Sequence, residues 1–237
     1  MTGKKYAAAA KLLDRSQYYV LTEALTLIKK MVTDENTKHK FDETIELHFR
    51  LGIDPRHSDQ QVRSTVLLPA GLGKKVRVLV FAEGDDARAA EASGADIVGD
   101  DQIINRIANE GWMDFDAALA TPAMMKKLGR IARVLGPRGL MPNPKAGTVV
   151  EGSDIQRAVD ELKAGRVEFR NDKTGNLHVP IGKGSFTIEQ LEQNASAVLS
   201  AVVAQRPSAV KGIYLRRMVV CATMSPGVRV DLAGAGK

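Results

Sequence analysis

Cysteine and histidine are scarce in this sequence, and their scarcity excludes two classes of protein. A single cysteine, Cys221, occurs among 237 residues. The chain therefore forms no intrachain disulfide bond and suits a reducing compartment. The four histidines show no ligand-like spacing, and one thiolate is too few for a typical zinc site, so no metal site is expected.

Long apolar runs are also absent. No stretch approaches the ~18 consecutive apolar residues that a membrane-spanning helix requires. The first residues, MTGKKYA, lack the apolar centre and cleavage pattern of a secretion signal. We therefore expect a cytoplasmic protein that has no membrane partner.

Motifs for nucleotide binding and catalysis are missing as well. The sequence contains no G-x-G-x-x-G before a helix, no phosphate-binding loop and no G-x-S-x-G. The glycines of GLGKK at 71–75 precede a predicted strand, which is the wrong side for a phosphate cradle. We expect no catalytic residues and no cofactor. A nucleotide-binding enzyme that uses the middle of the chain remains the alternative.

Charge is unevenly distributed along the chain, which carries a net charge of +6. Residues 1–70 hold 11 basic and 9 acidic side chains, residues 71–163 hold 13 and 14, and residues 164–237 hold 10 and 5. The excess therefore lies at the two ends. This asymmetry indicates that the two ends together form a basic surface for a polyanion. The alternative is that the uneven distribution of charge arises by chance.

The middle of the chain alternates apolar strands with helical patterns, which is typical of a parallel α/β unit. The predicted strands are 76–81, 95–98 and 115–120, and the predicted helices are 85–93, 101–110 and 122–135. Residues 136–145 contain three prolines and two glycines and are predicted to be a loop. A helix follows over 154–163, with Ser153 as its N-cap and Gly165 as its stop.

The two ends of the chain have an α+β pattern instead. The periodicity predicts helices at 22–33 and 187–206, and a half-buried strand at 45–51 with a partner strand at 62–68. The runs 166–171 and 176–181 surround a Gly-containing turn and predict a β-hairpin. Final strands are predicted at 213–223 and 228–232, and the last residues, 233–237, are expected to fray.

These patterns predict a split α+β domain built from residues 1–70 and 164–237, with an inserted parallel, Rossmann-like α/β domain at 71–163. Neither end has enough strands for a stable sheet alone.

Some polar and aromatic residues have two interpretations. Strand 45–51 places Glu46, His48 and Arg50 on one face, which is either a solvated surface or, with the turn at 172–175, a nucleic-acid contact. Phe41 is either a core or edge aromatic or a contact to a nucleotide ring or ribose. The segment 223–227 has the composition of a plain turn.

Six motifs together carry a family resemblance. They are FDET (41–44), LGIDPR (51–56), WMDFD (112–116), LGPRGLMPNPK (135–145), FRNDKTG (169–175) and KG (211–212). In this order they resemble the ribosomal protein L1 family, the stalk proteins of the large bacterial subunit, over about residues 4–232.

The resemblance implies a split first domain, an inserted α/β domain and no catalysis. It implies that the first domain binds large-subunit ribosomal RNA, and that the stalk moves with deacylated tRNA leaving the exit site. Many bacterial members also repress translation of their own mRNA by binding its leader. We expect a monomer when the chain is off the ribosome.

The resemblance also implies an RNA-binding set of residues. The set comprises Lys40, Phe41, Thr44, Arg50, Asp172, Lys173, Thr174, Gly175, His178, Thr223, Met224 and Ser225. Ser225 stands where the family usually has glycine, and its side chain either crowds the RNA or bonds to it. A basic group in the middle of the chain is either a solvated surface or a second nucleic-acid contact; it comprises Arg130, Arg133, Arg138 and Lys145.

Overall fold

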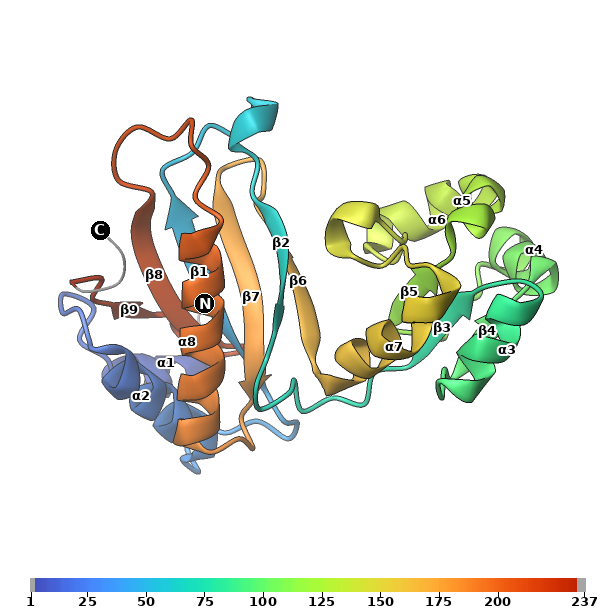
Figure 1. Ribbon diagram of the computed structural model, residues 1–237. Helices are drawn as coiled ribbons and strands as arrows, with labels where there is room; N and C mark the ends of the chain where they lie inside the picture. Colours follow the sequence, from blue (N-terminus) through green and yellow to red (C-terminus); the bar gives the residue numbers. More distant parts are fainter. Residues whose placement is uncertain (1–2, 234–237) are drawn as a thin grey trace. The chain divides into compact units, whose positions relative to one another are not determined.

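The computed structural model describes residues 3–233, and the chain divides into two compact units (Figure 1). The split unit comprises Met1–Gly73 and Val167–Lys237, and the inserted unit comprises Lys74–Arg166. The mixed α/β and α+β fold class predicted from the sequence is confirmed. Residues 234–237 of the tail, for which the sequence predicts fraying, lie outside the described residues.

A four-stranded antiparallel sheet, sheet A, organises the split unit. Its strand order is β7-β1-β8-β9, with β7 at Asn176–Lys183, β1 at Thr44–Leu51, β8 at Leu215–Ala222 and β9 at Val228–Val230. Strand β1 forms as the alternation predicts, because Ile45, Leu47 and Phe49 are buried while the residues between them are half-buried or exposed. The core therefore lies on one face of the sheet.

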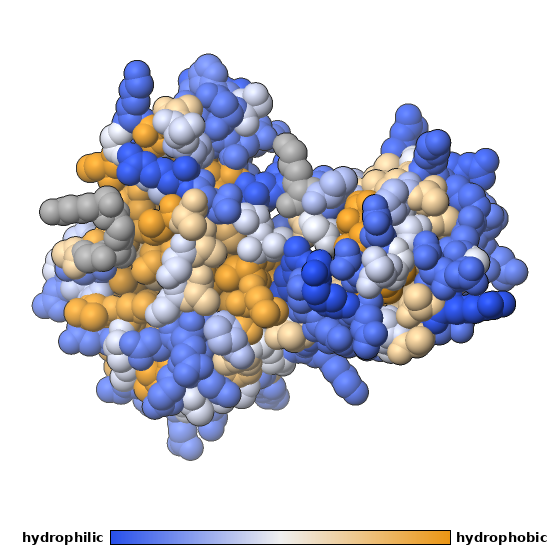
Figure 2. All heavy atoms as spheres, in the orientation of Figure 1, coloured by the Kyte–Doolittle hydropathy of each residue, from blue (hydrophilic) through white to orange (hydrophobic). Residues whose placement is uncertain are grey.

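Helices α2 (Leu21–Thr33) and α8 (Ile188–Ala204) pack on that face (Figure 1). Helix α8 begins with a capping box, in which Thr187 and Gln190 each satisfy a backbone N–H of the other. Helix α1 (Lys4–Lys11) was not predicted from the sequence. In the view shared by Figures 1 and 2, apolar side chains gather over the split unit, whereas the inserted unit is mostly hydrophilic.

A separate two-stranded sheet contradicts two strand pairings predicted from the sequence. Strand β2 (Arg63–Leu67) pairs with β6 (Arg166–Arg170), not with β1, and β6 forms no hairpin with β7. Both edges of β1 are already occupied, by β7 and β8. Asn171 fixes the β2–β6 pair, because its backbone and its side chain both bond to the backbone of Val62.

The inserted unit has a three-stranded parallel sheet, as predicted, and its strand order is β4-β3-β5. Its strands are β3 (Val78–Phe81), β4 (Ile97–Gly99) and β5 (Ala117–Ala120). Its helices are α3 (Asp85–Ala92), α4 (Asp101–Glu110), α5 (Pro122–Leu128), α6 (Ala132–Leu135) and α7 (Ile155–Ala164). Two apolar clusters bury the two faces of this sheet.

Local details of the inserted unit differ from the prediction. The helix predicted at 122–135 is interrupted by a 3-10 turn, Gly129–Ile131. The predicted loop at 136–145 contains 3-10 turns at Gly136–Arg138 and Pro144–Ala146. Ser153 lies within another such turn and does not cap α7, whereas Gly165 ends α7 with a φ of 106°. Short 3-10 turns tolerate glycine and proline where a longer helix does not.

The described residues contain neither a membrane-spanning helix nor a cluster of metal ligands. In the part of the chain that the structure describes, no helix is long and apolar enough to cross a membrane. Among the same residues, no group of three or more His, Cys, Asp or Glu side chains is arranged to hold a metal ion.

Candidate nucleic-acid interface

Sheet A has a second face, opposite α2 and α8, which we call the open face. Residues directly opposite each other in antiparallel strands point to the same side. His48 pairs with His178 on β7 and Val219 on β8, and Val219 pairs with Arg229 on β9. The register therefore places these side chains on the open face: Thr44, Glu46, His48, Arg50, Asn176, His178, Pro180, Lys183, Arg217, Val219, Cys221 and Arg229. With three arginines, one lysine and one carboxylate, this set is basic.

The first end of the open face joins β1 to the loop after β8. The backbone N–H of Thr223 donates to the Thr44 carbonyl at 3.0 Å, and the Thr44 N–H donates to the Thr223 hydroxyl at 3.1 Å. Lys183 donates to the Thr44 hydroxyl at 2.8 Å. The two segments, 179 residues apart in sequence, are thereby locked to each other, and we call this pairing the clasp.

A buried carboxylate completes the clasp. Glu43 is 2% exposed. One of its oxygens accepts the Met224 backbone N–H at 2.9 Å, and the other lies 2.8 Å from Nδ1 of His39. A buried carboxylate needs such partners, because an unpaired one is strongly destabilising. Glu43 thus holds the 224 loop against the segment that precedes β1.

Two large apolar side chains project from the segments held in this way. Phe41 is 51% exposed and Met224 is 49% exposed. The ring of Phe41 lies 5.9 Å from that of His39, centroid to centroid. Phe41 is therefore not a core aromatic, and the edge position remains. Lys40, beside it, is exposed and forms no ion pair within the described residues.

Ser225 neither points freely outward nor strains the turn. Its hydroxyl accepts the Ala222 N–H at 2.8 Å, and its own N–H donates to the Ala222 carbonyl at 3.1 Å. No described non-glycine residue has a positive φ. The conformation at position 225 therefore does not require glycine, and the added hydroxyl stabilises the turn.

The second end of the open face is the turn at 172–175. The Asp172 carboxylate accepts the backbone N–H groups of Thr174 and Asn176 at 2.8 Å each, together with the Thr174 hydroxyl and the Asn176 side-chain amide. Partial burial raises the pKa of Asp172, but these hydrogen bonds outweigh it and hold the pKa well below its usual range. Asp172 therefore shapes the turn from within.

The rest of the turn is fixed by Arg50 and Gly175. Arg50 donates to the Thr174 carbonyl and, at 3.2 Å, to the side-chain oxygen of Asn176. Gly175 has a φ of 81°, which a side chain would strain, and its carbonyl accepts the Leu51 N–H at 2.9 Å. Lys173 is exposed at the tip and forms no ion pair among the described residues.

A chain of hydrogen bonds lies between the two ends. Burial raises the pKa of the Cys221 thiol to about 11, so the thiol is protonated at pH 7, and its Sγ lies 2.8 Å from Nε2 of His48. Nδ1 of His48 in turn lies 2.7 Å from Nδ1 of His178, which is hydrogen-bond distance. Burial, followed by the electrostatic effect of His178, lowers the pKa of His48.

The site residues predicted from the sequence thus lie in two groups, one near each end of β1. Thr44 and Arg50 are six positions apart on β1, which corresponds to about 20 Å. The clasp end holds Lys40, Phe41, Thr44, Thr223, Met224 and Ser225, and the turn end holds Arg50, Asp172, Lys173, Thr174, Gly175 and His178. The open face between them joins the two groups.

Some residues of the interface were not predicted. Glu43 was not, although positions 43, 45 and 47 share the buried side of the strand alternation, which was the available signal. Lys183, Arg217 and Arg229 reach the face only through strand pairing, which periodicity does not reveal. In the inserted unit, Arg130, Arg133 and Arg138 are exposed, and the side chain of Lys145 lies outside the described residues.

Comparison with known proteins identifies the family. Residues 31–226 match the model of the ribosomal protein L1p/L10e family. The chain belongs to the ribosomal protein L1 family. The large ribosomal subunit protein uL1 of Chloroflexus aggregans is 56% identical over 97% of this chain and 95% of its own length. The uL1 proteins of Persephonella marina and Solibacter usitatus are 54% and 52% identical, covering 97% and 98% of this chain and 93% and 94% of their own lengths.

Membership of the L1 family confirms the resemblance inferred from the six motifs. It also makes the chain a structural, non-enzymatic protein. The alternative of a nucleotide-binding enzyme is therefore set aside.

Proposed function

We propose that this protein is a structural constituent of the large ribosomal subunit in the cytoplasm, and that it binds large-subunit ribosomal RNA through the open face of sheet A. Its relatives are large-subunit proteins. The split unit, with its basic open face, is the RNA-binding domain. The protein is a monomer when it is off the ribosome.

The clasp end is the observation that carries the RNA-binding proposal. Phe41 and Met224 expose apolar surface beside backbone groups that Glu43 and Thr223 hold in place. Folded RNA is read largely by shape, through ribose, phosphate and exposed bases. Two apolar side chains that exclude water strengthen the polar contacts between them, because hydrogen bonds are stronger in a lower dielectric. Lys40 and Lys183 supply positive charge for phosphates.

A titration tests this proposal. A fragment of large-subunit stalk RNA is titrated into the protein across a salt series, with an unrelated RNA hairpin as control. We expect the stalk fragment to bind more tightly and to lose less affinity as salt rises, because part of its binding energy is not electrostatic. Equal and equally salt-dependent binding of both RNAs would contradict a specific site.

The same face serves two further roles in the proposal. On the ribosome the bound protein assists release of deacylated tRNA from the exit site. Off the ribosome it represses translation of its own mRNA by binding a leader that mimics the ribosomal site. In the titration above, the leader is expected to compete with the stalk fragment, and simultaneous binding of both RNAs would contradict a shared site.

A further inference from the structure

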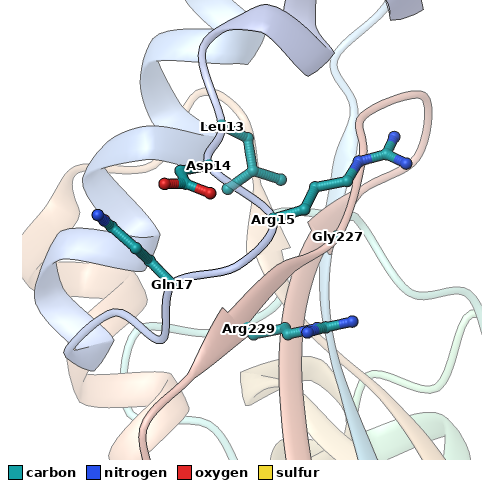
Figure 3. Close-up of a pocket in the computed structure, with 6 residues that line it drawn as sticks. All are labelled: Leu13, Asp14, Arg15, Gln17, Gly227 and Arg229. Carbon is teal, nitrogen blue, oxygen red and sulfur yellow. The ribbon is translucent and has the colours of Figure 1, made fainter.

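A pocket of about 210 Å³ lies where the segment after α1 meets β9 (Figure 3). Its lining residues are Leu13, Asp14, Arg15, Gln17, Gly227 and Arg229. It is smaller than the roughly 300–1,000 Å³ of sites that enclose a whole small-molecule ligand. Its size therefore suits one charged group of a larger molecule.

The positive charge of the pocket is not neutralised by the protein. Arg15 and Arg229 are exposed, and neither forms an ion pair with any residue from 3 to 233. Asp14 is the one carboxylate in the lining, and it already accepts the N–H and the hydroxyl of Ser16 at 2.9 and 2.6 Å. Figure 3 shows the two arginine side chains extending to the same side, with the Asp14 carboxylate on the other. Two unpaired guanidinium groups at one pocket favour an anion.

An exposed aromatic ring accompanies this charge. Tyr18 is 59% exposed, and the guanidinium carbon of Arg229 lies 6.0 Å from its ring centroid. Exposed aromatic rings beside basic groups are the usual means of holding an unpaired base, which stacks on the ring while its phosphate meets the cation.

The backbone segments that carry the two arginines are held together although the arginines are 214 positions apart in the sequence. Tyr19 donates its N–H to the Arg229 carbonyl at 3.0 Å and accepts the Asp231 N–H at 2.9 Å, which adds its segment to the edge of sheet A. The Tyr19 hydroxyl accepts the Asp14 N–H at 3.2 Å. The backbone of the pocket is therefore organised before any ligand binds, which lowers the entropic cost of binding.

The pocket is also continuous with the open face. Arg229 pairs with Val219 on β8, and Val219 lies four residues before Thr223 of the clasp. That separation is about 14 Å along the strand, plus one strand spacing of about 5 Å. One RNA molecule at the clasp can therefore reach the pocket.

We propose that Arg15, Arg229 and Tyr18 form a subsite for one unpaired RNA nucleotide, with its phosphate between the two guanidinium groups and its base stacked on Tyr18. This proposal rests on the RNA-binding function proposed above. The subsite places a single-stranded segment of the RNA at the β9 edge of the open face.

The test compares matched variants in RNA titrations across a salt series, with a stalk RNA fragment that keeps its flanking single-stranded nucleotides. The double variant Arg15→Gln/Arg229→Gln is expected to bind about tenfold more weakly at 0.1 M salt. Its log–log salt slope is expected to fall by about 0.7–0.9 for each phosphate that the variant no longer neutralises. Lys30→Gln is the charge control, because Lys30 is exposed on α2, which packs on the opposite face of the sheet. It should change affinity less than twofold.

Tyr18 provides a second comparison. Tyr18→Phe keeps the ring and should bind as the parent does, whereas Tyr18→Ala should bind RNA about fivefold more weakly. Because Tyr18 is exposed, circular dichroism of both variants should match that of the parent.

The outcomes separate this subsite from the main proposal. If the stalk fragment is no longer preferred over an unrelated hairpin, the proposed function itself fails. If the preference persists but the arginine double variant behaves like Lys30→Gln, the subsite is wrong. If inorganic phosphate or AMP binds the pocket while the double variant binds RNA normally, the pocket is a site for a free phosphate, and the RNA subsite is overturned.

Discussion

Glu43→Ala is expected to weaken binding of the stalk RNA fragment at least tenfold and to lower the free energy of unfolding by about 2–3 kcal/mol. The substitution removes a buried carboxylate that accepts the Met224 N–H and contacts His39. Both partner groups then lose this hydrogen-bond partner, and the clasp loosens. RNA titration and urea denaturation measure the two effects.

Glu46→Ala is the matched control for this variant. Glu46 is also on β1, but it is half-buried on the open face. Its removal takes one negative charge from the proposed RNA surface, so RNA affinity should stay the same or rise. If Glu43→Ala binds RNA as tightly as Glu46→Ala does, the clasp does not shape the RNA site.

Asp172→Asn is expected to destabilise the turn at 172–175 and to reduce RNA affinity about tenfold, equivalent to about 1.4 kcal/mol. The amide replaces one acceptor oxygen with a donor, which faces the donors of Thr174 and Asn176. A turn no longer fixed in its bound geometry must be ordered when RNA binds. Asp59→Asn, at an exposed position in a 3-10 turn, should leave affinity unchanged.

The Asp172 variant also has a distinct pH signature. The native pKa of Asp172 is held well below 3.8. Because the pKa is depressed in the native state, the carboxylate stabilises the protein above about pH 4, and this contribution is lost as pH falls toward the native pKa. Asp172→Asn should therefore unfold with a weaker dependence on pH below about 4 than the parent. An unchanged dependence would mean that the turn does not rely on the Asp172 charge.

The sequence predicted those features that depend on local patterns. The alternation at 45–51 revealed β1 and its two faces, and the strand–helix alternation revealed the parallel sheet of the inserted unit. Gly165 ends α7 as expected, because only glycine readily adopts a φ of 106°.

Long-range pairing was the part that local patterns did not predict. The runs 166–171 and 176–181 have the composition of a hairpin, but β6 pairs with β2, more than 100 positions away. The clasp is a second long-range pairing, because it joins residues 44 and 223. The contact of Tyr18 with Arg229 is a third, and it was not predicted. Side-chain periodicity reports which residues share a face of one element, but not which elements meet.

Burial of a polar group was the second kind of feature that composition obscured. A glutamate before a strand is usually solvated, yet Glu43 is 2% exposed, because the 224 loop covers it and donates a backbone N–H to it. The sequence suggested that the side chain of Ser225 either crowds the RNA or bonds to it. In the structure its hydroxyl accepts the backbone N–H of Ala222 within its own turn.

Hydrogen exchange of the whole protein, with and without the stalk RNA fragment, tests the central claim most directly. That claim is that RNA covers the open face of sheet A. We expect RNA to slow exchange in peptides that cover 39–44, 172–176 and 222–226, and to leave α2 and α8 unchanged. Slowed exchange in α2, α8 or the inserted unit, with none in those three peptides, would contradict the claim.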